Sequence, residues 1–270
     1  MRERLHYLFS ARAKLERADE HVDTLRSEMK AFAEPYPIEI EYVREAGGAR
    51  HVLRLRVIKE PPFLRWSLLV GDCLFNLRAV LDHAIYGCVA RRTRQVPPPD
   101  EDVLAFPITD SPENFAKSIR RLGALQSEGW FVAAVAGLQP FNRGDGTNLP
   151  ALWLLHQLNN ADKHRLVRII RAMSRTGEVN FRNISPGAYR IRSEVFGSGS
   201  LKDGTDIAAF TFDPAAPDAE VDFEVVFAPV IEHPPGPDGR TRSDVDWLLK
   251  YIRDEVAHAV DAIDAAWTLR

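Results

Sequence analysis

The stretch from Pro62 to Arg92 most constrains what this chain can fold into, because its apolar side chains repeat with helical spacing over about eight turns. Placed about 100° apart, these side chains form one continuous face. The opposite face carries short or chemically active side chains, namely Asp72, Asn76, Arg78, Asp82, His83 and Tyr86. A solvated helix face usually carries Lys, Glu and Gln instead. The sequence therefore predicts a helix over 62–92 whose polar stripe is the floor of a pocket or part of an interhelical network.

A second helix is predicted over residues 150–174, and its apolar stripe contains Asn159 and Asp162. Leaving either group unsatisfied in a core would cost about 1 to 3 kcal/mol. We therefore expect the polar stripe of the 62–92 helix to supply their partners. Arg78 on that helix and the nearby Arg165 are the cations expected to pair with Asp162.

The far side of the same predicted helix carries a basic stripe. Its members are His164, Arg168, Arg171 and Arg175. Such a stripe is either a solvated face or a surface that holds RNA phosphates, and binding of the second kind weakens sharply with salt.

Two more helices are predicted near the ends of the chain. A heptad-like apolar seam from Leu8 to Phe32 predicts a helix over about residues 5–34. Ser243, with Asp246 at the capping-box position, predicts the start of a last helix over 243–268. The seam packs on another helix of the same chain or forms a homodimer interface, and the last helix favours packing within the chain.

Period-two alternation predicts strands in two places. A β-hairpin is expected over 37–58 around Gly47-Gly48, with charges of opposite sign paired on its outer face. An antiparallel meander of about four strands is expected over 177–229. The predicted fold class is therefore α+β: a single domain, 1–270, in which a bundle of about four long helices packs with an antiparallel sheet of about six strands.

Composition limits the partners and the compartment. A net charge of −3 over 270 residues gives no overall attraction to nucleic acid or to anionic membranes. No secretory signal precedes the first predicted helix, and the longest apolar run, Trp66–Val70, is far shorter than the roughly twenty residues of a membrane span. We therefore expect a cytoplasmic protein with no membrane partner. Cys73 and Cys88 lie too far apart on one helix to bridge and are expected to be buried thiols.

Several chemistries lack their sequence patterns. There is no phosphate-binding or dinucleotide-binding fingerprint and no Gly-x-Ser-x-Gly elbow. Asp82, His83, Asp162 and His164 are suitable metal ligands by type, but neither helix has a His-x3-His or Glu-x2-His pair. We therefore expect no metal and no other cofactor.

Five short motifs lie between positions 60 and 170. They are Asn-Leu-Arg at 76–78, Leu-Asp-His at 81–83, Phe-Pro-Ile at 106–108, Leu-Gln-Pro-Phe at 138–141, and Asp-Lys-His-Arg at 162–165. As a set they resemble a family of uncharacterised bacterial proteins of similar length. This resemblance implies no particular activity, but it marks Lys163, His164 and Arg165 as candidate supporting or binding residues, together with the polar stripe of the 62–92 helix.

Arg78 and His83 are separated by four residues, and this spacing is similar to the Arg-x4-6-His motif of the HEPN superfamily. That superfamily includes metal-independent ribonucleases of toxin and defence systems, and the resemblance implies an RNA-cleaving or RNA-binding protein. His83 would be the general acid or base, and Arg78 would stabilise the negative charge of the phosphorane as it develops. Such sites are commonly assembled across a homodimer.

The same residues also fit a non-catalytic role. Arg78 and Asp82 are an i, i+4 pair, and Asp72 or Asn76 is placed to hydrogen-bond His83. In that alternative the polar network is structural, and the chain is an interaction protein or a small-ligand sensor.

Overall fold

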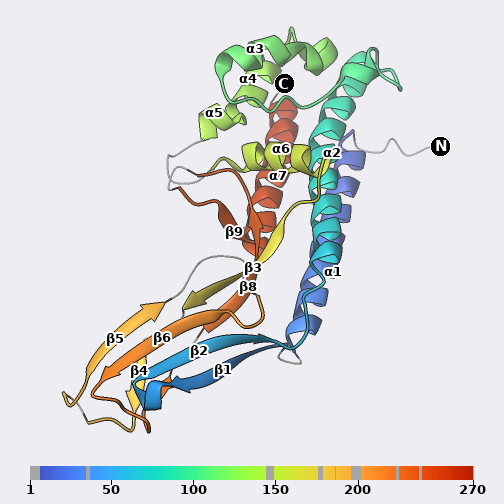
Figure 1. The fold of residues 1–270 in the computed structure, drawn as a ribbon. Coiled ribbons are helices and arrows are strands. Elements are labelled where there is room, and N and C mark those ends of the chain that lie inside the picture. Colours follow the sequence, from blue (N-terminus) through green and yellow to red (C-terminus); the bar gives the residue numbers. More distant parts are fainter. Residues whose placement is uncertain are drawn as a thin grey trace. The chain divides into compact units, whose positions relative to one another are not determined.

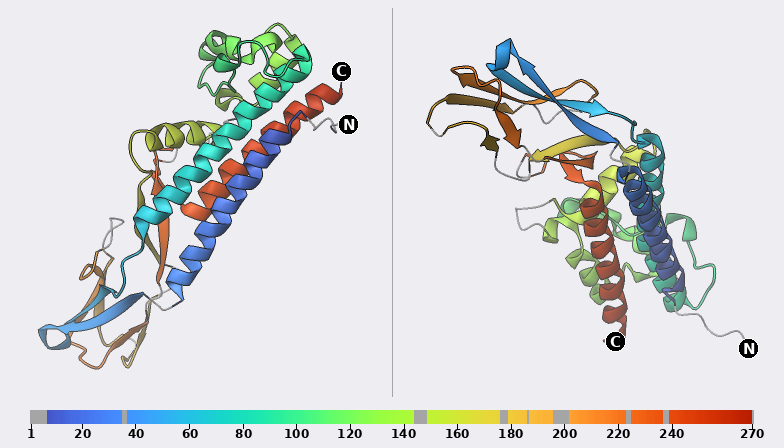
Figure 2. Two further views of the ribbon diagram at one scale, coloured as in Figure 1. Left: turned by 90° about the vertical axis from the view of Figure 1, so that its right-hand side faces the viewer. Right: turned by 90° about the horizontal axis from the view of Figure 1, so that it is seen from below.

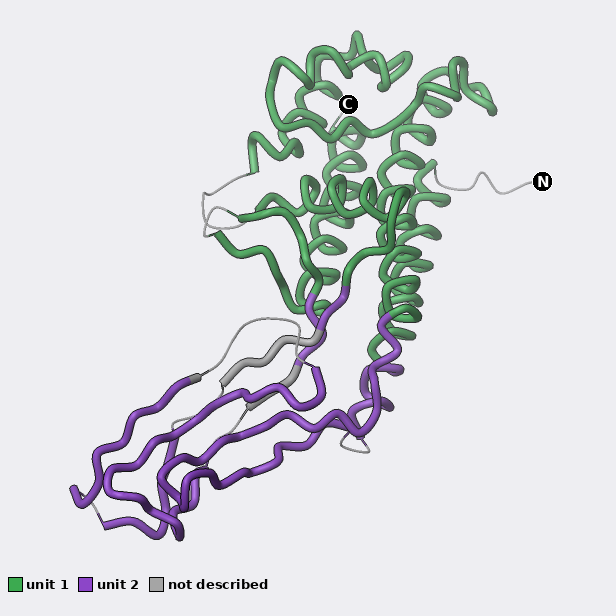
Figure 3. Tube along the Cα trace, viewed as in Figure 1, with its two compact units in different colours: residues 1–26, 64–168, 231–270 green, residues 27–63, 169–230 purple. Residues whose placement is uncertain are grey.

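The computed structural model describes residues 7–34, 37–143, 149–175, 179–185, 187–195, 202–222, 225–236 and 239–269. Its fold is α+β, as predicted. The chain forms two compact units (Figure 3). A mainly helical unit comprises residues 1–26, 64–168 and 231–270, and a mainly β unit comprises residues 27–63 and 169–230.

Three long helices form the frame of the helical unit. They are α1 (Phe9–Ala33), α2 (Phe63–Thr93) and α7 (Val245–Thr268), and they lie side by side (Figures 1 and 2). The predicted seam of α1 is buried at Ala18 and Val22, and Arg253 of α7 donates two hydrogen bonds of 2.9 Å to Asp19. The seam of α1 therefore packs within the chain. The expected helical residues 5 and 6 lie outside the described residues.

Shorter helices complete the helical unit. They are η2 (Glu101–Val103), α3 (Pro112–Ser118), η3 (Ile119–Leu125), α4 (Gly129–Gly137), α5 (Pro140–Arg143) and α6 (Ala151–Asp162). Ser111 caps α3, because its hydroxyl accepts a hydrogen bond of 3.2 Å from the Asn114 amide. The predicted cap of α7 was wrong by one residue: Asp244 accepts from the Trp247 amide, and Ser243 instead bonds His233.

The hairpin of the β unit is confirmed. Strands β1 (Ile38–Glu45) and β2 (Arg50–Val57) pair antiparallel around η1 (Ala46–Gly48). Gly47 and Gly48 have φ of 62° and 86°, which favours glycine at these positions. On the outer face Glu45 lies 2.6 Å from Arg50, so the predicted pairing of opposite charges is also present.

The remaining strands are β3 (Ile169–Arg175), β4 (Asn180–Arg182), β5 (Arg190–Val195), β6 (Asp206–Asp213), β7 (Glu220–Asp222), β8 (Val225–Glu232) and β9 (Arg242–Asp244). The described residues form three sheets, in the orders β1-β2-β6-β5, β3-β8-β9 and β4-β7. The single sheet of about six strands and the simple meander were therefore wrong. Phe181 of β4 packs edge-on against Phe210 and Phe212 of β6, which joins the two-stranded sheet to the core of the four-stranded one.

The expected helix over 150–174 was also wrong in its second half. Helix α6 ends at Asp162, and Ile169–Arg175 is strand β3, so the described residues contain three long helices, not four. Val167 and Ile169 are buried while Arg168 between them is exposed, and this alternation of β-branched and polar residues suits a strand better than a helix. The predicted basic stripe is therefore absent as a helix face.

The members of that stripe have separate surroundings. His164 is exposed after the end of α6, and Arg168 lies 3.0 Å from Glu232. Arg171 and Arg175 belong to β3, and their side chains lie outside the described residues.

Cys73 and Cys88 are free and buried, as predicted, and burial raises the pKa of each thiol to about 12. None of the helices in the described residues combines the length and the apolar character that crossing a bilayer requires.

Gly87 allows the start of α1 to lie directly on α2. A Cβ at this position would be 2.0 Å from the Tyr7 carbonyl oxygen, whereas nothing lies within 4 Å of a Cβ at Gly137 of α4. We expect Gly87→Ala to lower the free energy of unfolding by about 1 to 3 kcal/mol through this clash. Gly137→Ala is the control and should be neutral or slightly stabilising. Urea unfolding measures both, and equal stabilities of the two variants would contradict the close packing at Gly87.

Candidate functional site

The polar stripe of α2 divides between two sides of the helix. Residues five apart on a helix point about 140° away from each other. Arg78 accordingly contacts Phe106 in the extended segment before α3, whereas His83 lies near Lys14 of α1. The two residues of the Arg-x4-His motif therefore have different neighbours.

Arg78 and Asp82 together hold the backbone of Phe106. Arg78 Nε and Nη2 donate to the Asp82 carboxylate at 3.2 and 2.7 Å, and Nη2 also donates to the Phe106 carbonyl oxygen at 2.7 Å. Asp82 Oδ1 in turn accepts from the Phe106 amide at 2.9 Å. The Phe106 side chain is completely buried, and the Arg78 side chain is 16% exposed. The four bonds close a ring, which we call the Phe106 clamp.

His83 is half-buried. The non-catalytic alternative placed Asn76 to hydrogen-bond this histidine, but Asn76 bonds other groups instead. Asn76 Nδ2 donates to the Asp72 carbonyl oxygen at 2.8 Å, and Asn76 Oδ1 accepts from Lys14 at 3.3 Å. Burial lowers the pKa of His83, and the charge of Lys14 lowers it further, while Asp82 acts in the opposite direction. Above pH 6.5 the imidazole is therefore neutral and has one nitrogen able to accept a proton.

Asp162 lies against α2, but not against Arg78 or Arg165. A Cβ at Gly71 would be 2.6 Å from Asp162 Oδ2, so the carboxylate rests on the backbone of α2. Asp162 Oδ1 is buried and has no hydrogen-bond partner in the described residues. Burial raises the pKa of Asp162, a hydrogen bond from the Val167 amide lowers it, and the charge of Asp72 raises it. The predicted cation partners of Asp162 were wrong.

The other predicted residues are scattered around these groups. Asn159 is buried in α6, Tyr86 is half-buried on α2, and Asp72 is exposed. Lys163, His164 and Arg165 are exposed where the chain leaves α6.

His156 on α6 belongs to this region and was not predicted. Its Nε2 lies 3.0 Å from Asn160 Nδ2. Burial lowers its pKa, and the charges of Arg78, Lys163 and Arg121 act in the same direction, against a smaller effect of Asp110. A neutral histidine thus lies among cations from three elements. The spacing of His156, Asn160 and Lys163 by four and three residues places them on one helix face and was the available signal.

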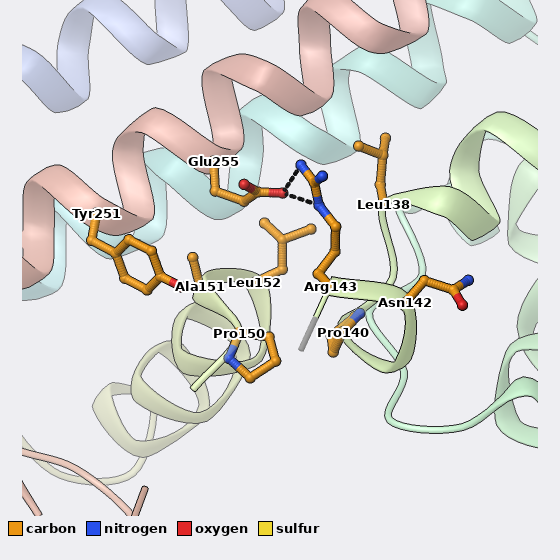
Figure 4. Close-up of a pocket in the computed structure, with 9 residues that line it drawn as sticks. All are labelled: Leu138, Pro140, Asn142, Arg143, Pro150, Ala151, Leu152, Tyr251 and Glu255. Carbon is orange, nitrogen blue, oxygen red and sulfur yellow. Dashed lines mark hydrogen bonds and ion pairs between the residues drawn. The ribbon is translucent and has the colours of Figure 1, made fainter. Parts of the chain in front are cut away.

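A cavity of about 410 Å³ lies elsewhere in the helical unit (Figure 4). The residues that line it are Leu138, Pro140, Asn142, Arg143, Pro150, Ala151, Leu152, Tyr251 and Glu255. Arg143 Nε and Nη2 both donate to Glu255 Oε1, at 2.8 and 2.6 Å. The Leu-Gln-Pro-Phe motif contributes two of these residues, but no sequence pattern indicated that α7 would complete a cavity with them.

Among the described residues, no group of three or more His, Cys, Asp or Glu side chains is arranged to hold a metal ion. Comparison of the chain with models of protein families, with curated proteins and with solved structures found no match.

Removing Asp82 tests the Phe106 clamp. Asp82→Ala leaves the buried Phe106 amide and the Arg78 guanidinium without their acceptor, so the free energy of unfolding should fall by about 1 to 3 kcal/mol. Asp261→Ala is the control, because Asp261 is 74% exposed and 4.0 Å from Arg12. This exposed pair should contribute less than about 1 kcal/mol. Urea unfolding compares the two, and a loss no larger for Asp82→Ala than for Asp261→Ala would contradict the clamp.

Two of the half-buried histidines, His83 and His156, predict a pH dependence of stability. Their pKa values are lowered in the folded protein from 6.5, so below pH 6.5 the unfolded chain binds protons that the folded chain does not. The stability that these two groups contribute is therefore fully present above pH 6.5 and is lost as the pH drops through their folded pKa values. His83→Gln and His156→Gln should each flatten the curve between pH 6.5 and 5, measured by thermal unfolding. An unchanged curve in the double variant would exclude these groups as its cause.

Proposed function

We propose that this chain is a non-catalytic small-ligand sensor or interaction protein in which the Arg78–Asp82 pair is structural. The Phe106 clamp is the observation that supports this proposal. An arginine that stabilises a transition state must direct its N–H groups at the place where charge develops. Arg78 instead directs Nε and Nη2 at Asp82 and at a backbone carbonyl oxygen.

The cavity of Figure 4 is the proposed ligand site. Its volume of about 410 Å³ lies within the usual range for small-molecule sites, roughly 300 to 1,000 Å³. Its lining combines apolar residues, among them Leu138 and Pro140, with polar side chains that can orient a ligand, here Arg143, Glu255 and Tyr251.

A second candidate function is HEPN-like RNA cleavage or RNA binding, of the kind found in toxin and defence systems. His83 favours it: within the described residues no hydrogen bond engages its half-buried ring, and its lowered pKa leaves a neutral proton acceptor. In this function a homodimer would bring a second Arg78 near His83. The exposed Lys163, His164 and Arg165 would contact RNA phosphates, and no metal would be needed.

An RNA cleavage assay in EDTA separates the two functions. The sensor proposal predicts that the wild-type chain leaves labelled single-stranded RNA intact, and that His83→Ala melts within about 2 °C of wild type because the ring makes no hydrogen bond. The second candidate predicts cleavage that His83→Ala abolishes. His258→Ala is the matched control, since His258 is exposed on α7. Cleavage that survives in His258→Ala but not in His83→Ala would overturn the sensor proposal.

A further inference from the structure

We infer that the cavity of Figure 4 binds a free amino acid as its zwitterion, with the ligand carboxylate at Arg143 and the ligand ammonium group at Glu255. This inference rests on the proposed sensor function and names the class of ligand. The ligand side chain lies against the apolar part of the cavity lining.

The Arg143–Glu255 pair leaves part of its hydrogen-bonding capacity unused. Both donating nitrogens of Arg143 contact the same oxygen, Oε1 of Glu255, at 2.8 and 2.6 Å. Within the described residues, neither Glu255 Oε2 nor Arg143 Nη1 takes part in a hydrogen bond. The two side chains are 21% and 34% exposed. Each therefore keeps one polar atom available to a molecule in the cavity.

The charge of the pair selects the charge of the ligand. A ligand with only a carboxylate would compete with Glu255 for Arg143 and leave the glutamate uncompensated in a partly buried site. A ligand with only an ammonium group would compete with Arg143 for Glu255 and leave the arginine uncompensated. A zwitterion supplies both charges, so that one ion pair is replaced by two. It is the simplest ligand that compensates both side chains at once.

The walls select the rest of the ligand. Leu138, Ala151 and Leu152 are buried, and Pro140 and Pro150 add two further apolar rings to the lining. The Tyr251 ring is held in place because its hydroxyl donates to the Leu149 carbonyl oxygen at 3.1 Å. Trp247 stacks on Tyr251, with ring centroids 5.2 Å apart and planes inclined by 15°. A fixed aromatic ring beside the apolar part of the lining favours an aliphatic or aromatic side chain over a charged one.

Isothermal titration calorimetry on the full chain tests the assignment with four probes: L-leucine, L-phenylalanine, N-acetyl-L-leucine and L-leucine amide. The two free amino acids should bind. Each blocked derivative lacks one of the two charges and should bind at least about tenfold more weakly, which corresponds to about 1.4 kcal/mol. Equal binding of N-acetyl-L-leucine or of L-leucine amide would overturn the zwitterion assignment.

Variants locate the binding. Arg143→Gln and Glu255→Gln should each weaken L-leucine binding at least about tenfold, because each removes the partner of one ligand charge. Asp254→Asn is the matched control, since Asp254 is the neighbouring acid of α7 but is paired with Lys250 and lies outside the cavity lining; it should bind L-leucine as the wild type does. Circular dichroism confirms that each variant is folded. Wild-type affinity in folded Arg143→Gln or Glu255→Gln would overturn the inference.

The experiments distinguish failure of the zwitterion assignment from failure of the proposed sensor function. If no free amino acid binds at millimolar concentration and the wild-type chain also leaves RNA intact, the zwitterion assignment fails and the sensor proposal stands. If the wild-type chain cleaves RNA through His83, the sensor proposal fails whatever the calorimetry shows.

Discussion

The helical unit depends on how the chain satisfies the backbone of Phe106. The Phe106 ring is fully buried, which forces its amide and carbonyl groups out of water in a segment that has no strand partner. Asp82 and Arg78, one turn apart on α2, supply one acceptor and one donor for these groups. Other backbone amides of this segment are satisfied in the same way: the Ala105 amide donates to the Arg121 carbonyl oxygen, and the Thr109 amide donates to the Gln139 side chain. The polar stripe of α2 thus anchors an extended segment as well as other helices.

The parts of the fold that could be predicted are those whose signal is local. Alternating apolar and polar residues on both sides of the Gly47-Gly48 turn specified the hairpin, because β1 and β2 are adjacent in sequence and bury one face. The seam of α1 was predictable because its heptad-like apolar spacing is also a local signal. The 150–174 stretch was predicted wrongly because Leu166, Ile169 and Ile170 lie at helical spacing, and a short apolar run does not by itself distinguish a helix from a strand. Tertiary context decided, since Ile169 and Ile170 are buried in β3 whereas Leu166 is 44% exposed.

The site shows the same limit. The i, i+4 spacing was sufficient to predict the Arg78–Asp82 pair, but Phe106, its third member, is 24 residues from Asp82, and the Phe-Pro-Ile motif that contains it did not indicate a contact with this pair. His156 was overlooked because its cationic neighbours come from separate elements. The Arg143–Glu255 pair is beyond sequence reasoning, since 112 residues separate its members. Buried polar positions can be inferred from periodicity, whereas the identity of their partners depends on tertiary packing.

Comparison of two Arg–carboxylate pairs of the helical unit, Arg78–Asp82 and Arg143–Glu255, shows why one is structural and the other suits a ligand. In the Phe106 clamp both carboxylate oxygens accept from Arg78, and a backbone amide and carbonyl occupy further positions. An incoming charge would have to break several bonds without replacing those to Phe106. In the Arg143–Glu255 pair both bonds converge on one oxygen, and the pair borders a cavity. A zwitterion can exchange with that pair while every charge remains compensated. The number of backbone partners, more than the identity of the residues, therefore separates the two roles.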